Sequence, residues 1–114
     1  MSDSNNQINL TQTKGYSVRI FIAGDLDIIK QTCRDYCYQI GLCVTVTPTS
    51  YIYTGGEESG AIIELINYAR FPKETTTIWN QAVELGQEIM IKACQTSYTV
   101  QDNEYSQWFS RRKD

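Results

Sequence analysis

Apolar and polar residues alternate with a period of two near the start of the patterned part of the chain. Residues 16–24 read YSVRIFIAG, and Val18, Ile20 and Ile22 fall on one face before Gly24 interrupts the pattern. An alternation of this kind, rich in β-branched residues, predicts a strand.

Four more segments carry strand signals. Residues 42–54 alternate until Pro48, which has no N–H to donate to a sheet and favours an edge or a bend, so we expect one bent strand or two short ones. Residues 61–72 are apolar on both faces, which predicts a strand that is buried on both sides or forms an interface. Two short final strands are predicted around a turn, at residues 97–101 and 106–110.

Apolar residues recur every three or four positions in two other segments, which predicts helices. The first helix spans residues 26–40, where Asp25 is placed to cap the N-terminus and Gly41 to end the helix. Its apolar stripe is formed by Ile29, Cys33, Cys37 and Ile40. The second helix spans residues 76–94, and we expect Gly86 within it to allow a close approach to the sheet. Its apolar stripe is formed by Ile78, Ala82, Leu85, Ile89 and Ala93.

The predicted order is β-α-β-β-α-β with an additional C-terminal strand, which is typical of the ferredoxin-like α+β fold. In that fold two helices cover one face of an antiparallel sheet and the other face stays open. The open face can be lined by Ile62, Ile66 and Tyr68, together with Tyr51 and Tyr53. A patch of this kind is too apolar for a lone monomer, so we expect a homo-oligomer.

The start of the chain differs from the rest. Residues 1–14 contain only Met1, Ile8 and Leu10 as apolar residues, too few to offset the entropy of ordering the segment. We therefore expect a disordered tail at residues 1–14, followed by a single domain at residues 15–114.

Charge and hydropathy argue against several classes of protein. The 114 residues carry a net charge of −3, which gives no overall attraction to nucleic acid or to an anionic membrane. No apolar run approaches the ~20 residues that span a bilayer, and the polar start does not resemble a secretory signal. We expect a cytoplasmic protein without nucleic-acid or membrane partners.

The cysteines do not form a recognisable metal or redox motif. Cys33, Cys37, Cys43 and Cys94 follow no C-x-x-C spacing, and the chain has no histidine. Three of the four fall where core residues are expected. We predict reduced structural thiols, and neither a metal nor a cofactor.

The first candidate site is a predicted hairpin tip within residues 49–60. Gly55 and Gly56 can adopt the positive φ angles of a tight turn, so they can serve the turn alone. The alternative is a ligand site, in which Tyr51, Tyr53 and exposed backbone amides hold a planar polar ligand.

The second candidate site combines the ends of two strands. The residues at these ends are Asn67, Tyr68 and Arg70 in one case and Trp108, Arg111 and Arg112 in the other. If the two ends meet, in one chain or across an oligomer interface, Arg70 with Arg111 or Arg112 would hold a phosphate between aromatic walls that stack a base. The alternative is a solvated basic tail.

Groups that commonly catalyse reactions are scarce. Without histidine the commonest general base is missing, and no Ser or Cys lies in a nucleophile motif. The adjacent Glu57 and Glu58 would point to opposite sides of a strand, so they cannot form a carboxylate pair unless the turn reorients them, and we expect them to solvate the loop. The sequence therefore predicts a protein that is not an enzyme.

Several segments resemble small uncharacterised proteins encoded by bacteriophages: IFIAGDLDIIKQTCRDYC, VTVTPTSYIYTGGEESG, LINYARFP and WFSRR. The resemblance covers most of the chain after residue 15 and implies a protein that acts in the host cytoplasm by stoichiometric binding. The layout is also similar to PII-type and ACT-type domains, which bind small effectors at subunit interfaces. Their sequence motifs are absent here, so this second likeness is one of fold alone.

These observations predict a non-enzymatic phage-type accessory protein that binds a small anionic or nucleotide-like ligand as an oligomer, with sequestration of a host defence signal as one role. The alternative is a protein-interaction module that inhibits a host or phage protein through the open sheet face or the acidic hairpin. An enzyme that uses carboxylates is the third and least favoured hypothesis.

Overall fold

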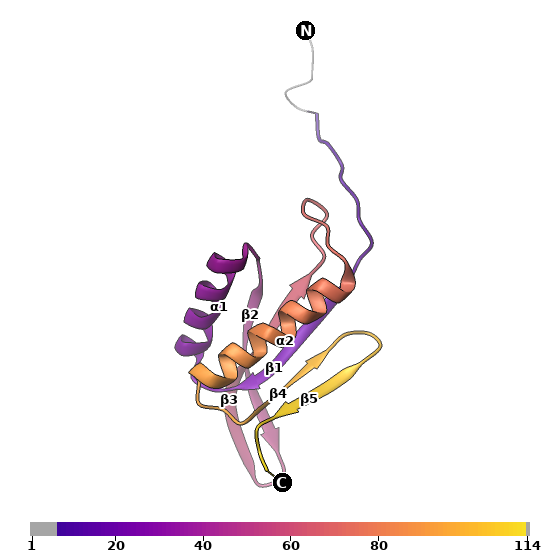
Figure 1. Ribbon diagram of the computed structural model, residues 1–114. Helices are drawn as coiled ribbons and strands as arrows, with labels where there is room; N and C mark the ends of the chain where they lie inside the picture. Colours follow the sequence, from indigo (N-terminus) through magenta and orange to yellow (C-terminus); the bar gives the residue numbers. More distant parts are fainter. Residues whose placement is uncertain (1–6, 114) are drawn as a thin grey trace.

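The computed structural model describes residues 7–113 and contains two helices and a five-stranded sheet (Figure 1). In chain order the elements are β1 (Ser17–Ala23), α1 (Leu26–Ile40), β2 (Thr45–Tyr53), β3 (Gly56–Ile66), α2 (Thr75–Lys92), β4 (Ser97–Gln101) and β5 (Ser106–Ser110). The predicted strand region from 42 to 54 thus contains one strand, Thr45–Tyr53, and the second helix is shorter at its C-terminal end than predicted.

The strands lie in the order β2-β3-β1-β4-β5, and each neighbouring pair is antiparallel. The first four have the arrangement of the ferredoxin-like fold, which confirms the predicted fold class. The fifth strand extends the sheet beyond β4, with which it forms a hairpin. Both helices lie on the same face of the sheet (Figure 1).

The ends of α1 are set by the residues that the sequence indicates. The Asp25 carboxylate accepts a hydrogen bond from the Ile28 N–H at 3.1 Å, which satisfies one of the free donors of the first turn. Gly41 adopts a left-handed conformation with φ 79°, and its N–H donates to the Cys37 carbonyl.

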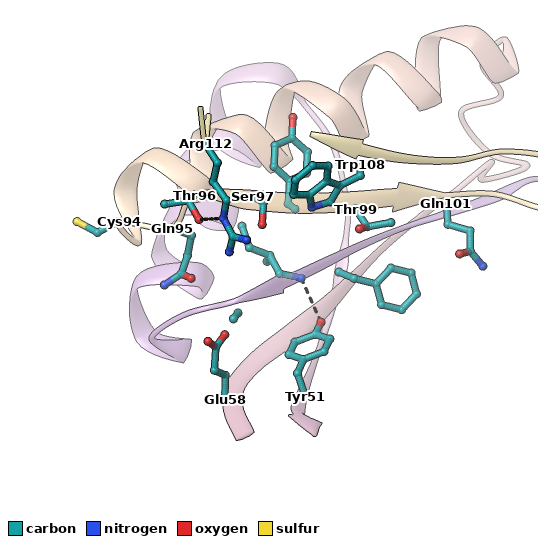
Figure 2. A pocket seen from close by; sticks show the side chains of 14 residues that line it. Tyr51, Glu58, Cys94, Gln95, Thr96, Ser97, Thr99, Gln101, Trp108 and Arg112 are labelled. Carbon is teal, nitrogen blue, oxygen red and sulfur yellow. Dashed lines mark hydrogen bonds between the residues drawn. The ribbon is translucent and has the colours of Figure 1, made fainter. Parts of the chain in front are cut away.

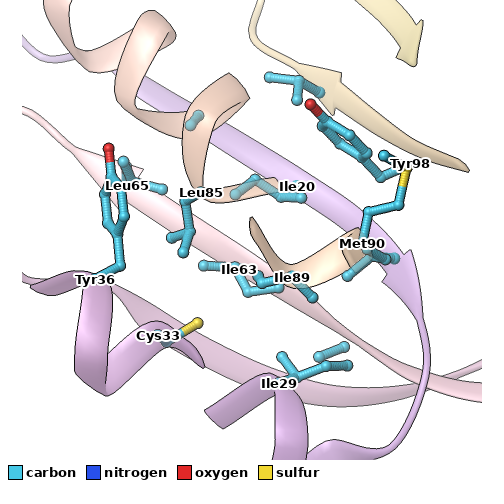
Figure 3. Packing of buried hydrophobic residues seen from close by; sticks show 14 of the residues in the cluster. Ile20, Ile29, Cys33, Tyr36, Ile63, Leu65, Leu85, Ile89, Met90 and Tyr98 are labelled. Carbon is cyan, nitrogen blue, oxygen red and sulfur yellow. The ribbon is translucent and has the colours of Figure 1, made fainter. Parts of the chain in front are cut away.

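The core fills the space between the helices and one face of the sheet (Figure 3). Its largest fully buried side chains are Ile20, Ile22, Ile29, Ile63, Leu65, Ile78, Leu85, Ile89, Val18 and Val100. Gly86 faces the Tyr98 ring, where a Cβ atom would lie 2.6 Å from Tyr98 Cδ2. The predicted close approach of the second helix to the sheet is therefore confirmed.

The cysteines are less buried than the periodicity predicts. Cys33 is buried in the core, Cys37 is half-buried, and Cys43 and Cys94 are exposed. The expectation of three core thiols is wrong. Cys94 follows the last turn of α2, in a left-handed conformation with φ 56°, rather than continuing the apolar stripe.

The face of the sheet opposite the helices is open, as predicted. The strand registers place Thr47, Ile62, Phe21, Thr99 and Trp108 in one row across this face. Ile66 also lies on it, whereas Tyr68 comes after β3 has ended. Among residues 7–113, neither helix is long and apolar enough to cross a membrane.

The N-terminal segment leaves the domain beside the start of β1 (Figure 1). Residues 7–14 form neither helix nor strand, and residues 1–6 of the predicted disordered tail lie outside the described residues. Asn67 holds the base of the segment, since its Nδ2 donates to the Lys14 carbonyl at 3.0 Å.

Candidate functional site on the open face

A hollow of about 520 Å³ lies on the open face, between the β2–β3 hairpin and the β4–β5 hairpin (Figure 2). The side chains that give it chemical character are those of Phe21, Tyr51, Glu58, Ser97, Trp108 and Arg112. They come from all five strands and, for Arg112, from the residues that follow β5, so the sheet itself assembles most of the site.

The strand registers explain why the aromatic side chains gather here. Phe21 of β1 lies opposite Thr99 of β4, and Thr99 lies opposite Trp108 of β5. Because residues directly opposite in a sheet share a face, Phe21 and Trp108 border the same hollow with Thr99 between them. Trp108 is 58% exposed, which leaves its ring available to a ligand.

Tyr51 forms another wall and is tied to the backbone of the sheet. Its hydroxyl accepts a hydrogen bond from the Ile22 N–H at 3.1 Å and donates one to the Ala61 carbonyl at 2.6 Å. These two backbone groups face each other across the β1–β3 pair, so the phenol bridges two strands. Burial raises the pKa of Tyr51, which further favours the protonated hydroxyl that donates to Ala61.

Gly60 makes room for the Tyr51 ring. A Cβ atom at residue 60 would lie 2.7 Å from Ala23 Cα and 2.8 Å from Tyr51 Cε2, both too close for any side chain. The third glycine of residues 49–60 therefore serves the packing of a tyrosine against the sheet.

The hollow has one acidic and one basic side chain at different sides (Figure 2). Glu58 lies opposite Tyr51 in the hairpin and accepts a hydrogen bond from the Tyr53 hydroxyl at 3.1 Å. That hydrogen bond raises the pKa of Tyr53. Arg112 donates from Nε to Thr96 Oγ1 at 2.9 Å, which directs the guanidinium toward the hollow.

Some of the residues predicted from the sequence lie at or near this hollow. Tyr51 and Trp108 line it, and Tyr53 contacts it through Glu58. Gly55 forms the hairpin turn with φ 88°, and Gly56 lies under the Tyr53 ring, where a Cβ atom would lie 2.8 Å from Cε2. The two glycines thus have structural reasons to be present, and a direct contact with a ligand stays a prediction.

Other predicted residues lie at the opposite end of the sheet. Asn67, Tyr68 and Arg70 follow the end of β3, which pairs with the first residue of β1, whereas the hollow lies at the last residues of β1. The seven residues of β1 separate these ends by about 20 Å. A pocket that joins Arg70 to Arg111 is therefore not formed within one chain, and one shared between chains stays a prediction.

Each of these distant residues has a local contact. Asn67 binds the N-terminal segment, and the Tyr68 hydroxyl donates to Cys43 Sγ at 3.4 Å. Arg70 lies over the Phe71 ring with its guanidinium carbon 5.1 Å from the ring centroid. Arg111 donates from Nε to the Gln95 carbonyl at 3.0 Å, so Arg112 and not Arg111 lines the hollow.

Sequence reasoning missed Phe21 and expected Glu58 to solvate the loop or, in the alternative, to face a partner protein. The signal for both was strand alternation: Phe21 lies on the face opposite Val18, Ile20 and Ile22, and Glu58 on the face opposite Glu57. Extending the predicted open face by this alternation to residues 21 and 58 would have found them, although the contribution of β5 depends on its pairing.

By its fold and its hollow, this chain is a ferredoxin-like α+β protein with an aromatic hollow on the open face of the sheet. No family model and no curated protein sequence matches the chain. Among solved structures, a phage SAM lyase in the apo state is similar with a TM-score of 0.69 and 20% identity, over 93% of this chain and 99% of that one. A phage SAM lyase in complex with S-methyl-5′-thioadenosine is similar with a TM-score of 0.63 and 14% identity, over 95% and 98%.

These matches agree with the resemblance to phage proteins and correct the expected function. The expectation of a non-enzymatic protein, whether it sequesters a ligand or inhibits a partner, is contradicted by these matches, because both similar structures are lyases and each match covers more than nine-tenths of this chain. The absence of histidine does not by itself exclude a reaction of that kind. A sulfonium such as SAM carries its own leaving group, a neutral thioether, so its cleavage needs no acid to protonate it.

Proposed function

We propose that this protein is an enzyme that cleaves S-adenosylmethionine (SAM) or a closely related sulfonium. The observation that carries the proposal is the hollow on the open face, with aromatic walls, one carboxylate and one guanidinium, in a fold shared along its length with a phage SAM lyase. SAM has the matching parts: a planar adenine, a sulfonium cation and an amino-acid carboxylate.

The bond that breaks follows from the molecule bound to one of the similar structures. S-methyl-5′-thioadenosine keeps the adenosine, the sulfur and the methyl group of SAM. The bond lost is therefore the one between the sulfur and the Cγ atom of the methionine part, and its electron pair goes to sulfur, which becomes neutral. In a lyase the remaining fragment is completed without water, either by loss of a proton or by closure onto its own carboxylate.

Each side chain has a chemical reason for its proposed role. The exposed Trp108 ring offers a stacking surface for adenine, and aromatic faces such as Tyr51 attract a sulfonium as they attract other cations. Glu58 places a negative charge near that cation, and Arg112 can bind the carboxylate of the substrate. The roles are thus divided between a cation-binding side and an anion-binding side of one hollow.

The open side of the hollow supports the proposal of a homo-oligomer. Ile66 and Trp108 are both exposed on this face, and a second chain packed against it would cover them. Exclusion of water would also favour the route by closure, because the sulfonium and the carboxylate of the substrate both become neutral when the carboxylate closes onto Cγ.

The test is to incubate the purified protein with SAM and to measure S-methyl-5′-thioadenosine and the remaining fragment of the methionine part by liquid chromatography and mass spectrometry. A blank without protein is needed because SAM decays slowly by itself. We expect one S-methyl-5′-thioadenosine for each SAM lost, at a rate proportional to the protein concentration. A rate equal to that of the blank at all protein concentrations would refute the proposal.

Two variants test the site itself. Glu58→Gln should lower kcat/KM about 30-fold, the equivalent of about 2 kcal/mol for a charge-assisted contact. The matched control is Glu57→Gln, which makes the same change on the opposite face of the strand and should leave the rate unchanged. Equal effects of the two substitutions would place the reaction outside the hollow.

A further inference from the structure

The segment formed by residues 7–14, here called the arm, has the pattern of a strand without a partner. Ile8 is 93% exposed and Leu10 is 86% exposed, and they alternate with the polar Asn9 and Thr11. No residue between 7 and 13 is charged. An uncharged, alternating segment of this kind can pair with the edge of a sheet.

The base of the arm is held in place by side chains of the domain. The Asn67 amide uses both of its ends: Nδ2 donates to the Lys14 carbonyl at 3.0 Å, and Oδ1 accepts from the Lys73 N–H at 3.0 Å. The Tyr16 hydroxyl donates to the Asp102 carboxylate at 2.8 Å. The arm therefore leaves the domain in a defined direction, away from its own core (Figure 1).

The two edges of the sheet are not equally protected. At the β2 edge, Pro48 lies in the middle of the strand and interrupts any row of N–H donors. At the β5 edge there is no proline and no charged residue between Ser106 and Ser110. Natural edges are usually blocked by such residues, so the β5 edge is the one suited to accept another strand.

The backbone groups available at the β5 edge can be assigned. Asp102 N–H donates to the Tyr105 carbonyl, and Arg111 N–H donates to the Thr96 carbonyl. Hydrogen-bonded pairs alternate along an antiparallel ladder, so residues 105, 107, 109 and 111 bond to β4. The N–H and C=O groups of Ser106, Trp108 and Ser110 consequently point outward.

A second hollow, of about 640 Å³, lies next to the start of β5. It is bounded by the first turns of α2, the β4–β5 turn and the base of the arm, and its aromatic walls are Tyr16, Trp79 and Tyr105. Aliphatic side chains that arrive along the β5 edge would find an apolar surface there.

We propose that the arm of one copy of this protein adds as an extra strand to the β5 edge of a second copy, with Ile8 and Leu10 packed at the second hollow. The partner is thus a second copy of the chain, recognised through backbone hydrogen bonds and two aliphatic side chains. This contact shares Trp108 with the hollow proposed to bind SAM, but it uses the backbone of that residue and not its ring, and it does not depend on that function.

The test measures the mass of the full-length protein by light scattering over a range of concentrations. The variant Ile8→Asp with Leu10→Asp should raise the dissociation constant at least about 100-fold, because two aliphatic side chains lose their burial. The matched control is Asn9→Asp with Thr11→Asp, which adds the same charge to the other face of the arm and should assemble like the natural protein.

A second variant tests the accepting edge. Ser106→Pro removes one outward N–H at the first position of β5, where proline is tolerated, and should also prevent assembly. When the arm variant and the edge variant are mixed, the intact arm of one can bind the intact edge of the other, so assembly should return in part. Circular dichroism checks that each variant is folded.

Three results would overturn the proposal. The first is a natural protein that stays monomeric at all concentrations, as expected for an arm that is disordered or folds onto its own domain. The second is an arm variant that assembles like the natural protein, as expected if chains associate only through the open face. The third is a mixture of the two variants that does not assemble although both are folded.

Discussion

Gly86→Ala is a sharp test of the packing between α2 and the sheet, because two opposing effects differ in size. Alanine in place of glycine stabilises a helix interior by about 1 kcal/mol. Against this, the new Cβ atom would lie 2.6 Å from Tyr98 Cδ2 and 3.1 Å from Cζ. Whether the substitution stabilises or destabilises depends on whether the ring can move.

The Tyr98 ring is held on several sides. It is 3% exposed, its hydroxyl donates to the Val83 carbonyl at 2.8 Å, and it stacks on Phe109 with ring centroids 5.0 Å apart. Overpacking at such a site costs about 1–3 kcal/mol, and a contact this short belongs at the upper end. After the gain in helix propensity, we expect Gly86→Ala to lower the free energy of unfolding by about 1–2 kcal/mol.

The assay is urea unfolding followed by circular dichroism, together with the melting temperature, which should fall by about 5–10 °C. In a Tyr98→Leu background the ring is gone, and the same Gly86→Ala substitution should become stabilising by about 1 kcal/mol. A stabilising effect of Gly86→Ala in the natural background would show that the helix does not approach the sheet as closely as described.

Three further predictions concern single groups. Tyr51→Phe keeps the ring but removes both hydrogen bonds to the backbone of β1 and β3, so the free energy of unfolding should fall by about 1–2 kcal/mol in urea; unchanged stability would contradict the bridge. Asp25→Ala should cost about 1 kcal/mol through the lost cap of α1, whereas Asp25→Asn should cost much less in the same assay. Burial, with a smaller effect of Cys37, raises the pKa of Cys33 from 9.0 to about 12, so the folded state favours the neutral thiol. Its stabilisation is complete below pH 9 and is lost between pH 9 and about 12; the stability difference between the natural protein and Cys33→Ala should shrink over that range, and a constant difference would refute the shift.

The fold was predictable because its signals are local. Period-two alternation marks β1, Asp25 and Gly41 delimit α1, and Pro48 marks the strand at one edge of the sheet. The exposure of the cysteines was not predictable in the same way. A stripe of positions four residues apart does not tell where the neighbouring element ends, and Cys37 lies at the margin of the core.

The site was predictable only in part, because it depends on register across distant strands. Tyr51 and Trp108 were found from their chemistry, but their common hollow requires β5 to pair with β4, which one sequence does not settle. Glu57 and Glu58 show how the same strand alternation bears on two different questions. Their opposite orientation argued against a carboxylate pair, yet the same alternation places Glu58 beside Tyr51 on the open face. The absence of histidine argued against an enzyme, but the proposed substrate is a sulfonium that already carries a neutral leaving group, so the reaction would not depend on such a side chain.

The position of Tyr51 has a consequence for how this protein can change in evolution. One ring forms a wall of the hollow and also links the main chains of β1 and β3, so under the proposed function a substitution there would alter ligand preference and folding together. Trp108 and Arg112 border the same hollow without bridging two strands of the sheet through their side chains. If the hollow binds the proposed substrate, new specificities should arise by variation at residues 108 and 112, while residue 51 and the glycine beneath it, Gly60, change last.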